Sequence, residues 1–258
     1  MKSIVRQIAV VLATVVTIAT NALANILPIN GQLTGAISDS FPVRFTPAGY
    51  VFSIWGVIYL GLIVYSVYQA LPSQRNRPLQ NTVGWIYVAS AVFNSTWILA
   101  FHYLQFPLSL VIMLALLITL TAIYLQLKTG LEKAAPADQW LLRLPFSIYL
   151  AWICVATIAN ATIVLYDLGW NGQPFTPDLW AALMIVVGTV LASIIALTRR
   201  DVGYIAVFVW AYIGIVVAQS DSLTVAATAA LMTAVILAIL GFSLARRTPP
   251  PTALSPTA

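Results

Sequence analysis

Long apolar runs separated by short polar segments set the pattern of this chain. A helix of about 20 apolar residues crosses a membrane core about 30 Å thick, and the chain divides on that scale at its charges, prolines and polar loops. The pattern predicts eight spans, at residues 4–27, 47–71, 82–104, 107–127, 141–165, 179–197, 202–218 and 223–245. We therefore expect an all-α, polytopic membrane bundle, in which the seventh span is short for a crossing.

Composition agrees with this pattern. Hydrophobic residues make up 61% of the 258 residues and charged residues only 7%, whereas a soluble domain carries about 25% charged residues. The chain has too few charges to solvate a separate soluble domain. Cys154, the single cysteine, lies within an apolar run. We interpret it as a small packing residue, because one thiol supports neither a disulfide framework nor a metal cluster.

The basic residues test the number of helices independently, because Lys and Arg collect in cytoplasmic loops. With eight helices and cytoplasmic N- and C-termini, Arg44 alone among the 12 basic residues lies outside. The cytoplasmic basic residues are Lys2, Arg6, Arg75, Arg77, Lys128, Lys133, Arg143, Arg199, Arg200, Arg246 and Arg247. The net charge of +5 therefore reflects topology and contact with anionic membrane lipid. We expect no nucleic-acid partner.

The two ends of the chain need separate interpretation. Lys2 and Arg6, followed by an apolar run and Ala22-Leu23-Ala24, also resemble a signal peptide with its cleavage site. Apolarity continues to Pro28, which favours a retained first helix, and cleavage would leave the downstream charge map unchanged. Residues 248–258 are rich in proline and predict a disordered cytoplasmic tail.

The predicted spans contain no ionisable side chain deep in their interior. Proton relays and coupling-ion sites place such groups inside the bundle, so the pattern disfavours secondary active transport. His102, near the outer end of the third span, is interpreted as a hydrogen-bonded structural residue. Nucleophile triads, phosphate-binding glycine loops and metal-ligand spacings are missing from the sequence. We expect no enzyme activity, no catalytic or metal-binding residue and no required cofactor.

The spans do contain rings and amides on shared helix faces. Phe52, Trp55 and Tyr59 fall at i, i+3 and i+7 and therefore share one face. Two further spans carry similar faces, formed by Asn94, Trp97 and Phe101 in one and by Tyr149, Trp152, Ala156 and Asn160 in the other. Such faces indicate either helix packing with interhelical hydrogen bonds or a shared cavity for a flat apolar ligand. Both interpretations stay open on the residues alone.

Three motifs resemble the TspO/MBR family of tryptophan-rich sensory proteins, which includes the mitochondrial translocator protein. Pro47-Ala48-Gly49-Tyr50-Val51-Phe52, followed by Trp55 and Tyr59, is similar to the family's opening of its second helix. Asn94 and Trp97 look like the Asn-x-x-Trp motif of its third helix. The fifth-helix motif, Tyr-x-x-Trp-x-x-x-Ala-Thr-x-x-Asn, is matched by Tyr149, Trp152, Ala156, Thr157 and Asn160. The order and spacing of the motifs both agree.

The resemblance implies an architecture and a ligand. Residues 1–168 would form the family's five-helix ligand-binding bundle with residues 28–46 as its cap, and residues 169–247 an additional three-helix transmembrane region. Family members bind tetrapyrroles such as protoporphyrin, and some bind sterols, so the implied partner is a lipophilic small molecule of the porphyrin or sterol-like kind. By motif position the implied ligand-binding residues are Trp55, Asn94, Trp97, Trp152, Ala156 and Asn160, supported by Tyr50 and Phe52. The implied location is the bacterial cytoplasmic (inner) membrane.

The chain also departs from the family pattern. Tyr50 stands where the motif has Trp, Ala48 where it has its second Pro, and residues 28–46 contain no Trp. Our leading hypothesis is a membrane sensor or binding protein for a tetrapyrrole-like or other flat lipophilic ligand, without covalent chemistry. A transporter of porphyrin or another lipophile is the first alternative, and a porphyrin-degrading enzyme the second.

Small residues recur on the last predicted span. Alanines lie at four-residue steps along it, at Ala226, Ala230, Ala234 and Ala238. Such a stripe suits close packing of helices. It could pack against the bundle or against a second copy of the chain, so the pattern allows a homodimer.

Overall fold

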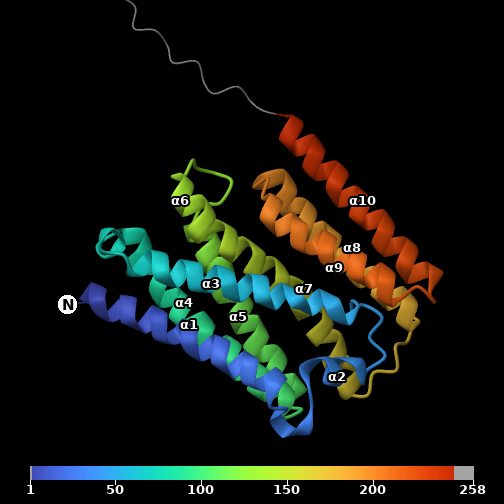
Figure 1. The fold of residues 1–258 in the computed structure, drawn as a ribbon. Helices are drawn as coiled ribbons and strands as arrows, with labels where there is room; N and C mark the ends of the chain where they lie inside the picture. The colour runs from blue at the N-terminus through green and yellow to red at the C-terminus, as the bar shows by residue number, and fades with distance from the viewer. Residues whose placement is uncertain (1, 247–258) are drawn as a thin grey trace, which may run out of the picture.

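The computed structural model describes residues 2–246, and this part of the chain is built of helices without strands (Figure 1). Seven helical segments are long and apolar enough to cross a membrane, and α9 is a shorter apolar helix. The main helices are α1 (Lys2–Ile26), α3 (Ile54–Ala70), α4 (Pro78–His102), α5 (Phe106–Gln126), α7 (Leu144–Asp167), α8 (Pro177–Thr198), α9 (Val202–Ala218) and α10 (Leu223–Ala245). The eight predicted spans and the all-α polytopic bundle are thus confirmed. The predicted tail at 248–258 lies outside the described residues.

Short helical pieces connect the main helices. These are α2 (Thr34–Asp39), α6 (Pro136–Asp138), the 3-10 turns η1 (Ile29–Gly31), η2 (Gly49–Ser53) and η3 (Pro72–Gln74), and the π-helical turn η4 (Gln139–Arg143). Two of them change the predicted boundaries. The second span opens with η2 before α3 begins, and the fifth is preceded by α6 and η4, which continue into α7.

Side-chain caps fix the starts of the last three long helices. Thr176, Asp201 and Ser222 each accept a hydrogen bond from a backbone amide in the first turn of α8, α9 and α10. These caps satisfy amide groups that have no partner within the helix. With 17 residues, α9 is roughly 25 Å long at 1.5 Å per residue, which is shorter than a hydrocarbon core of about 30 Å.

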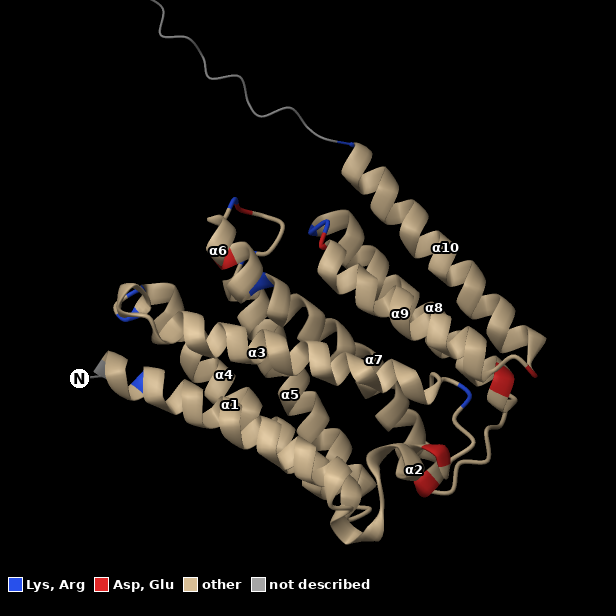
Figure 2. Ribbon diagram, viewed as in Figure 1, with Lys and Arg blue, Asp and Glu red and all other residues tan. Residues whose placement is uncertain are grey.

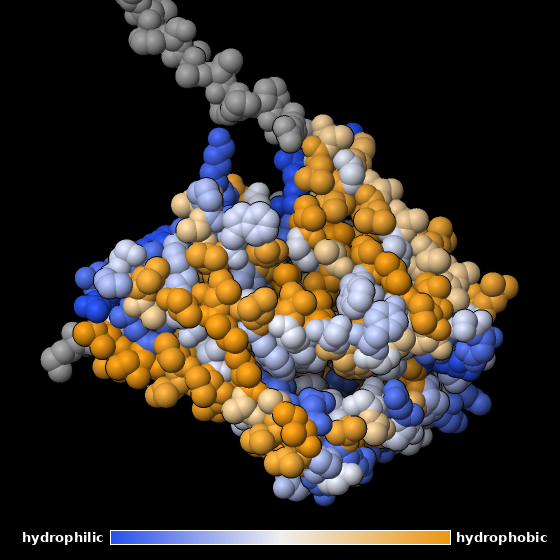
Figure 3. Space-filling model, viewed as in Figure 1, coloured by the Kyte–Doolittle hydropathy of each residue, from blue (hydrophilic) through white to orange (hydrophobic). Residues whose placement is uncertain are grey.

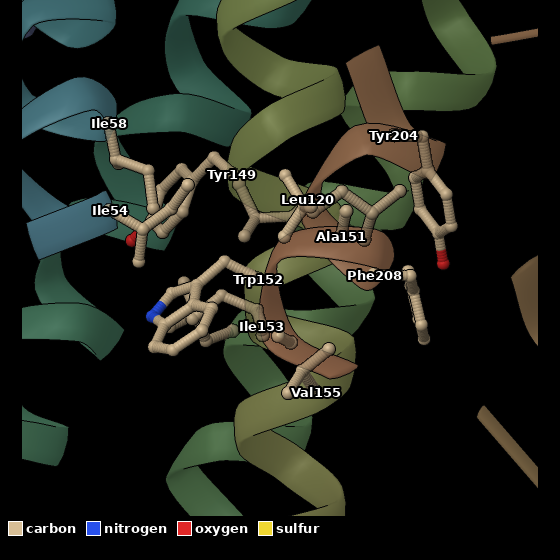
Figure 4. Packing of buried hydrophobic residues seen from close by; sticks show 14 of the residues in the cluster. Ile54, Ile58, Leu120, Tyr149, Ala151, Trp152, Ile153, Val155, Tyr204 and Phe208 are labelled. Atoms are coloured by element: carbon tan, nitrogen blue, oxygen red, sulfur yellow. The ribbon is translucent and has the colours of Figure 1, made fainter. Parts of the chain in front are cut away.

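Five of the helices form a closed ring, and the other three form a second group beside it. Around the ring each helix packs on the next in the order α1, α4, α5, α7 and α3. Helices α8, α9 and α10 pack on one another, and α9 joins the groups by lying against α7 and η2 (Figure 1). On α7, Tyr149 and Trp152 point toward α3, while Tyr204 and Phe208 of α9 lie on the other side (Figure 4).

Charged residues mark two different ends of the bundle (Figure 2). The basic end carries the α3–α4, α5–α6 and α8–α9 connections, where most Lys and Arg residues lie. The lid end carries residues 28–46, which we call the lid, together with Arg44 and four acidic residues, Asp39, Asp167, Asp178 and Asp221. The structure therefore keeps the charge separation on which the predicted topology rests.

One charge lies deeper than its position in the sequence indicates. Arg6, in the second turn of α1, is 0% exposed, and its Nη2 donates to the carbonyl of Gln74 at 3.4 Å. Gly84 makes room for it, because a Cβ at that position would lie 2.9 Å from Arg6 Cδ. The Arg6 side chain is therefore held inside the protein at the basic end, while its neighbours Ile4 and Val5 stay exposed.

The outer surface of the helices is largely apolar (Figure 3). Exposed large hydrophobic residues occur on α1, α3, α5, α8 and α10, as expected for lipid-facing helices. On α10 the residues that bury themselves against α8 and α9 are Val225, Ala229, Ile236 and Leu240. Ala230, Ala234 and Ala238 are exposed instead, so most of the alanine stripe is not the face that packs within the chain.

Candidate ligand-binding site

A small cavity of about 60 Å³ lies beneath the lid. Its walls come from η2, α3, α4 and α7, and its cover from Thr34, Ser38 and Thr46 of the lid. Six of the eight predicted ligand-binding residues line this cavity: Phe52, Trp55, Trp97, Trp152, Ala156 and Asn160. The structure thus brings together side chains from three separate motifs.

The rings around the cavity pack edge to face. Trp152 of α7 lies against Phe52 with ring centroids 5.9 Å apart at 86° and against Trp55 with centroids 6.3 Å apart at 85°. Tyr59, one turn further along α3, stacks on Trp55 at 5.6 Å. Aromatic pairs in such arrangements hold one another in place. The stripe of Phe52, Trp55 and Tyr59 therefore packs on α7 and also presents two of its rings to the cavity.

The polar groups of the cavity differ in how they are satisfied. Trp97 Nε1 donates to Asn160 Oδ1 at 3.2 Å, and Asn160 Nδ2 donates to Ser109 Oγ at 3.1 Å. Trp152 Nε1 is buried and has no hydrogen-bond partner among the described residues. A buried indole N–H usually finds an acceptor, so this donor keeps unused hydrogen-bonding capacity on a ring that lines the cavity.

Two predicted residues do not line the cavity. Asn94 is 0% exposed; it accepts from Asn21 Nδ2 at 2.7 Å and donates to the Tyr149 hydroxyl at 2.8 Å. Its amide therefore links α1, α4 and α7, which is the interhelical role that we considered for the asparagines. Tyr50 lies on the outer side of η2, where its ring contacts Trp210 of α9 edge to face at 5.4 Å.

His102 fastens the lid to the end of α4. Its Nδ1 donates to the Ile29 carbonyl at 3.2 Å, since a carbonyl can only accept, and its Nε2 bonds the Thr34 hydroxyl at 2.8 Å. Asn30 donates in turn to the His102 carbonyl at 3.0 Å. The imidazole is 0% exposed, so both of its nitrogens are occupied by the lid, in agreement with a structural histidine.

A second set of bonds fastens the far end of the lid to the three-helix group. Arg44 forms ion pairs with Asp221 at 2.6 Å and with Asp178 at 3.4 Å. Gln219, just beyond α9, accepts from Arg44 and donates to the Thr46 carbonyl. We call these contacts the latch. The basic-residue pattern of the sequence places Arg44 on the outer side, but no local pattern indicates that it meets these two acids.

Helix α9 also holds the segment that follows the lid. The amide of Ala48 donates to the Gly214 carbonyl at 3.1 Å, and Trp210 Nε1 donates to the Val51 carbonyl at 3.1 Å. Gly214 allows this approach, because a Cβ there would overlap Val51 Cγ2. The three-helix group therefore positions η2, from which Phe52 reaches the cavity.

The latch is expected to depend on pH and on Arg44. The hydrogen bond from Arg44 lowers the pKa of Asp221 below its ordinary value. The ion pair is therefore complete above about pH 4 and is lost as the pH falls through the lowered pKa. Arg44→Gln should raise hydrogen exchange of the amides of residues 40–48 by about two- to three-fold at neutral pH, since exposed ion pairs contribute little. Exchange in the parent, corrected for its intrinsic pH dependence, should rise likewise as the pH falls through the lowered pKa of Asp221.

Lys128→Gln is the matched control, because it breaks the Lys128–Glu132 pair of 2.6 Å at the basic end. It removes the same charge at an exposed ion pair far from the lid. Equal exchange of residues 40–48 in both variants would mean that Arg44 does not hold the lid.

Among residues 2–246, no group of three or more His, Cys, Asp or Glu side chains could hold a metal ion. The cavity combines apolar rings, one free indole donor and a hydrogen-bonded lid. Such a lining suits non-covalent binding of an apolar molecule with a polar edge.

This fold and this site define a multi-pass helical membrane protein with a lid-covered aromatic cavity at one end. A family model described as TSPO-like protein matches residues 7–242, which is most of the chain, and the chain belongs to this family. The match extends past residue 168, where the predicted five-helix bundle ends, through α8 and α9 and into α10. Comparison with curated proteins and with solved structures gave no match. Family membership supports a general role in sensing, ligand binding or transport at a membrane.

Proposed function

We propose that the protein is a membrane sensor or binding protein for a tetrapyrrole-like or other flat lipophilic ligand, which it binds without covalent chemistry. The observation that carries the proposal is the unpartnered, buried Nε1 of Trp152, whose side chain lines the cavity together with Phe52, Trp55 and Trp97. The rings offer flat surfaces for stacking on a macrocycle. The indole N–H offers one donor to a carboxylate or carbonyl at its edge.

The closed cavity is much smaller than its proposed ligand. Ligand pockets usually measure about 300–1,000 Å³, whereas the closed cavity measures about 60 Å³. Binding therefore requires the lid to move and the rings to separate. Both attachments of the lid, at His102 and at Arg44, are non-covalent, so the open form is separated from the closed form only by hydrogen bonds and packing. The apparent affinity then includes the free energy of opening.

Protoporphyrin titration tests the proposal. We expect saturable quenching of tryptophan fluorescence in the purified, detergent-solubilised chain. Trp152→Phe removes the indole donor and keeps an aromatic side chain, so it should weaken binding about 5- to 10-fold, the value of one hydrogen bond. An unchanged absorption spectrum of the bound porphyrin after illumination is expected for binding without covalent chemistry.

Trp85→Phe provides the matched control, because Trp85 is exposed on α4 and does not line the cavity. Its affinity for protoporphyrin should equal that of the parent. Quenching that never saturates, or equal losses in both variants, would argue against a site at Trp152.

One observation favours a transporter as the second candidate. A larger crevice opens at the basic end and reaches Ile54, which is the neighbour of Trp55 in the cavity wall. If the two hollows joined, they would form a path between the helical groups, and in alternating access one group rocks against the other around a site between them. Uptake of protoporphyrin into proteoliposomes that contain the protein, above uptake into empty vesicles, would identify transport.

A further inference from the structure

A crevice of about 710 Å³ separates the two helical groups at the basic end. It opens between the lobe that carries α6 and the lobe formed by α8, α9 and α10 (Figure 3). Its rim is formed by the α5–α6 connection, η4 and the α8–α9 connection, and its inner wall by α7, α9 and the start of α3. It is therefore a different hollow from the cavity beneath the lid.

The crevice is basic at its rim and apolar inside. Lys133, Arg143, Arg199 and Arg200 stand at the rim with two acids, Glu132 and Asp201. The inner wall carries aliphatic residues, Ile54, Leu144, Ile148, Val202, Ala206 and Val207. The crevice thus changes from basic side chains at the end of the bundle to aliphatic side chains nearer the middle of the predicted apolar core.

Both acids of the rim already have partners. Glu132 pairs with Lys128 at 2.6 Å. Asp201 is buried and accepts hydrogen bonds from the hydroxyls of Tyr124 and Ser147 and from the amide of Tyr204. Lys128, which is not a rim residue, neutralises Glu132, and the partners of Asp201 are uncharged, so the four basic residues of the rim face a single uncompensated acid and keep a net positive charge.

Several donors at the rim have spare hydrogen-bonding capacity. Arg199 Nη1 and Thr129 Oγ1 are buried and have no partner among the described residues, and Thr129 is only 3% exposed. Arg143 is 8% exposed, and its one side-chain hydrogen bond runs from Nη1 to the Glu132 carbonyl. Buried guanidinium groups are strongly stabilised by an anion that accepts several of their hydrogen bonds.

Two turns of the rim pack tightly against each other. Gly130 has a φ of +74°, and a Cβ at this position would overlap the carbonyl oxygen of Arg199. The α5–α6 turn therefore touches the α8–α9 connection directly. Contact between these two turns places Thr129 and Arg199 at the same edge of the crevice.

We propose that this crevice binds an anionic phospholipid from the surrounding leaflet. The phosphate of the lipid lies at Arg143, Arg199 and Thr129, and its acyl chain lies against Ile148, Ala206 and Val207. Basic pockets between transmembrane helices bind such headgroups. The predicted topology faces this end to the cytoplasm, where anionic lipid is available. A free phosphate would leave the apolar wall uncovered, and a neutral lipophile would leave the guanidinium groups unpaired.

Short-chain lipids test this proposal on the purified full-length chain in detergent. Dioctanoyl phosphatidylglycerol should raise the melting temperature and stay bound in native mass spectrometry. Dioctanoyl phosphatidylcholine and inorganic phosphate at the same concentration should do so much less. Arg199→Gln should weaken phosphatidylglycerol binding about 10-fold, the usual effect of one charge-assisted hydrogen bond.

A second variant fills the apolar wall. Ala206 is exposed at the inner wall. In Ala206→Phe the added ring should block the acyl chain, and binding of phosphatidylglycerol should fall by a similar factor. The matched controls are Arg75→Gln, on the α3–α4 connection, and Ala230→Phe, on the exposed face of α10. Both lie outside the crevice and should bind as the parent does. The melting temperature without lipid reports whether each variant is folded.

Three results would overturn the proposal. The first is parent-like binding in both Arg199→Gln and Ala206→Phe. The second is equal stabilisation by inorganic phosphate, which would make the crevice a site for free anions. The third is an equal loss of binding in Arg75→Gln, which would show that the lipid responds to the overall positive charge of the basic end and not to the crevice. None of these readouts uses protoporphyrin, so the outcome is independent of the proposed function.

Discussion

Ala156→Phe is expected to reduce protoporphyrin binding by at least about 10-fold. Ala156 lines the cavity from α7, between Trp152 and Asn160 of the same helix. A phenyl ring at this position would fill the volume of about 60 Å³ that the closed cavity offers and would press on the rings that must separate for a ligand. Overpacking of this kind costs about 1–3 kcal/mol, so most molecules of the variant should still fold. Fluorescence titration with protoporphyrin measures the effect.

Ala230→Phe is the control for this change. Ala230 is exposed on α10, which takes no part in the cavity, and the added ring should enter lipid or detergent without an effect on affinity. If Ala156→Phe bound protoporphyrin as tightly as the parent, the ligand would have to lie outside the cavity beneath the lid.

Gly214→Ala is expected to have the largest effect on stability. A Cβ on Gly214 would overlap Val51 Cγ2 and lie 3.0 Å from Pro47 Cβ, and Val51 is itself fully buried. Either α9 or η2 must therefore shift, at a cost of about 1–3 kcal/mol. We expect the melting temperature in detergent to fall by several degrees. Hydrogen exchange should increase at η2, because the bond from Ala48 to the Gly214 carbonyl would be strained.

Gly241→Ala makes the same substitution where there is space. No atom lies within 4 Å of a Cβ at Gly241, on α10, and alanine is favoured over glycine in helices by about 0.8–1 kcal/mol. This variant should be as stable as the parent or slightly more so. Equal destabilisation by both substitutions would show that the contact between α9 and η2 is loose.

The helices could be predicted from the sequence because their signal is strong. Apolar stretches of membrane length end at polar residues, and the seventh and eighth predicted spans coincide with α9 and α10. The local backbone at the start of the second span could not be predicted. Contacts of η2 with α9, through Val51 and Gly214, lie 159 or more residues apart in sequence, and no local pattern reports them.

The candidate site was predictable only in part. Rings at helical spacing placed Trp55, Trp97 and Trp152 on faces that the structure brings together. The same spacing did not distinguish Asn160, which reaches the cavity, from Asn94, whose amide is used between helices. Tyr50 was placed by its motif position, although its ring points to α9. The depth of a side chain and the direction in which it points depend on helix tilt and on neighbouring helices. The spacing of residues along the sequence gives no information about either.

Helix α9 touches both hollows of the protein. Ala206 and Val207, near its start, line the crevice at the basic end, and Trp210 and Gly214, further along, hold the segment that leads into the cavity. Occupants of the two hollows therefore share one structural element of 17 residues. Thermodynamic linkage then makes their influence reciprocal: if lipid at one end changes the affinity for a ligand beneath the lid, that ligand changes the affinity for lipid by the same factor. The composition of the bilayer would in this way enter the response of the protein to its ligand.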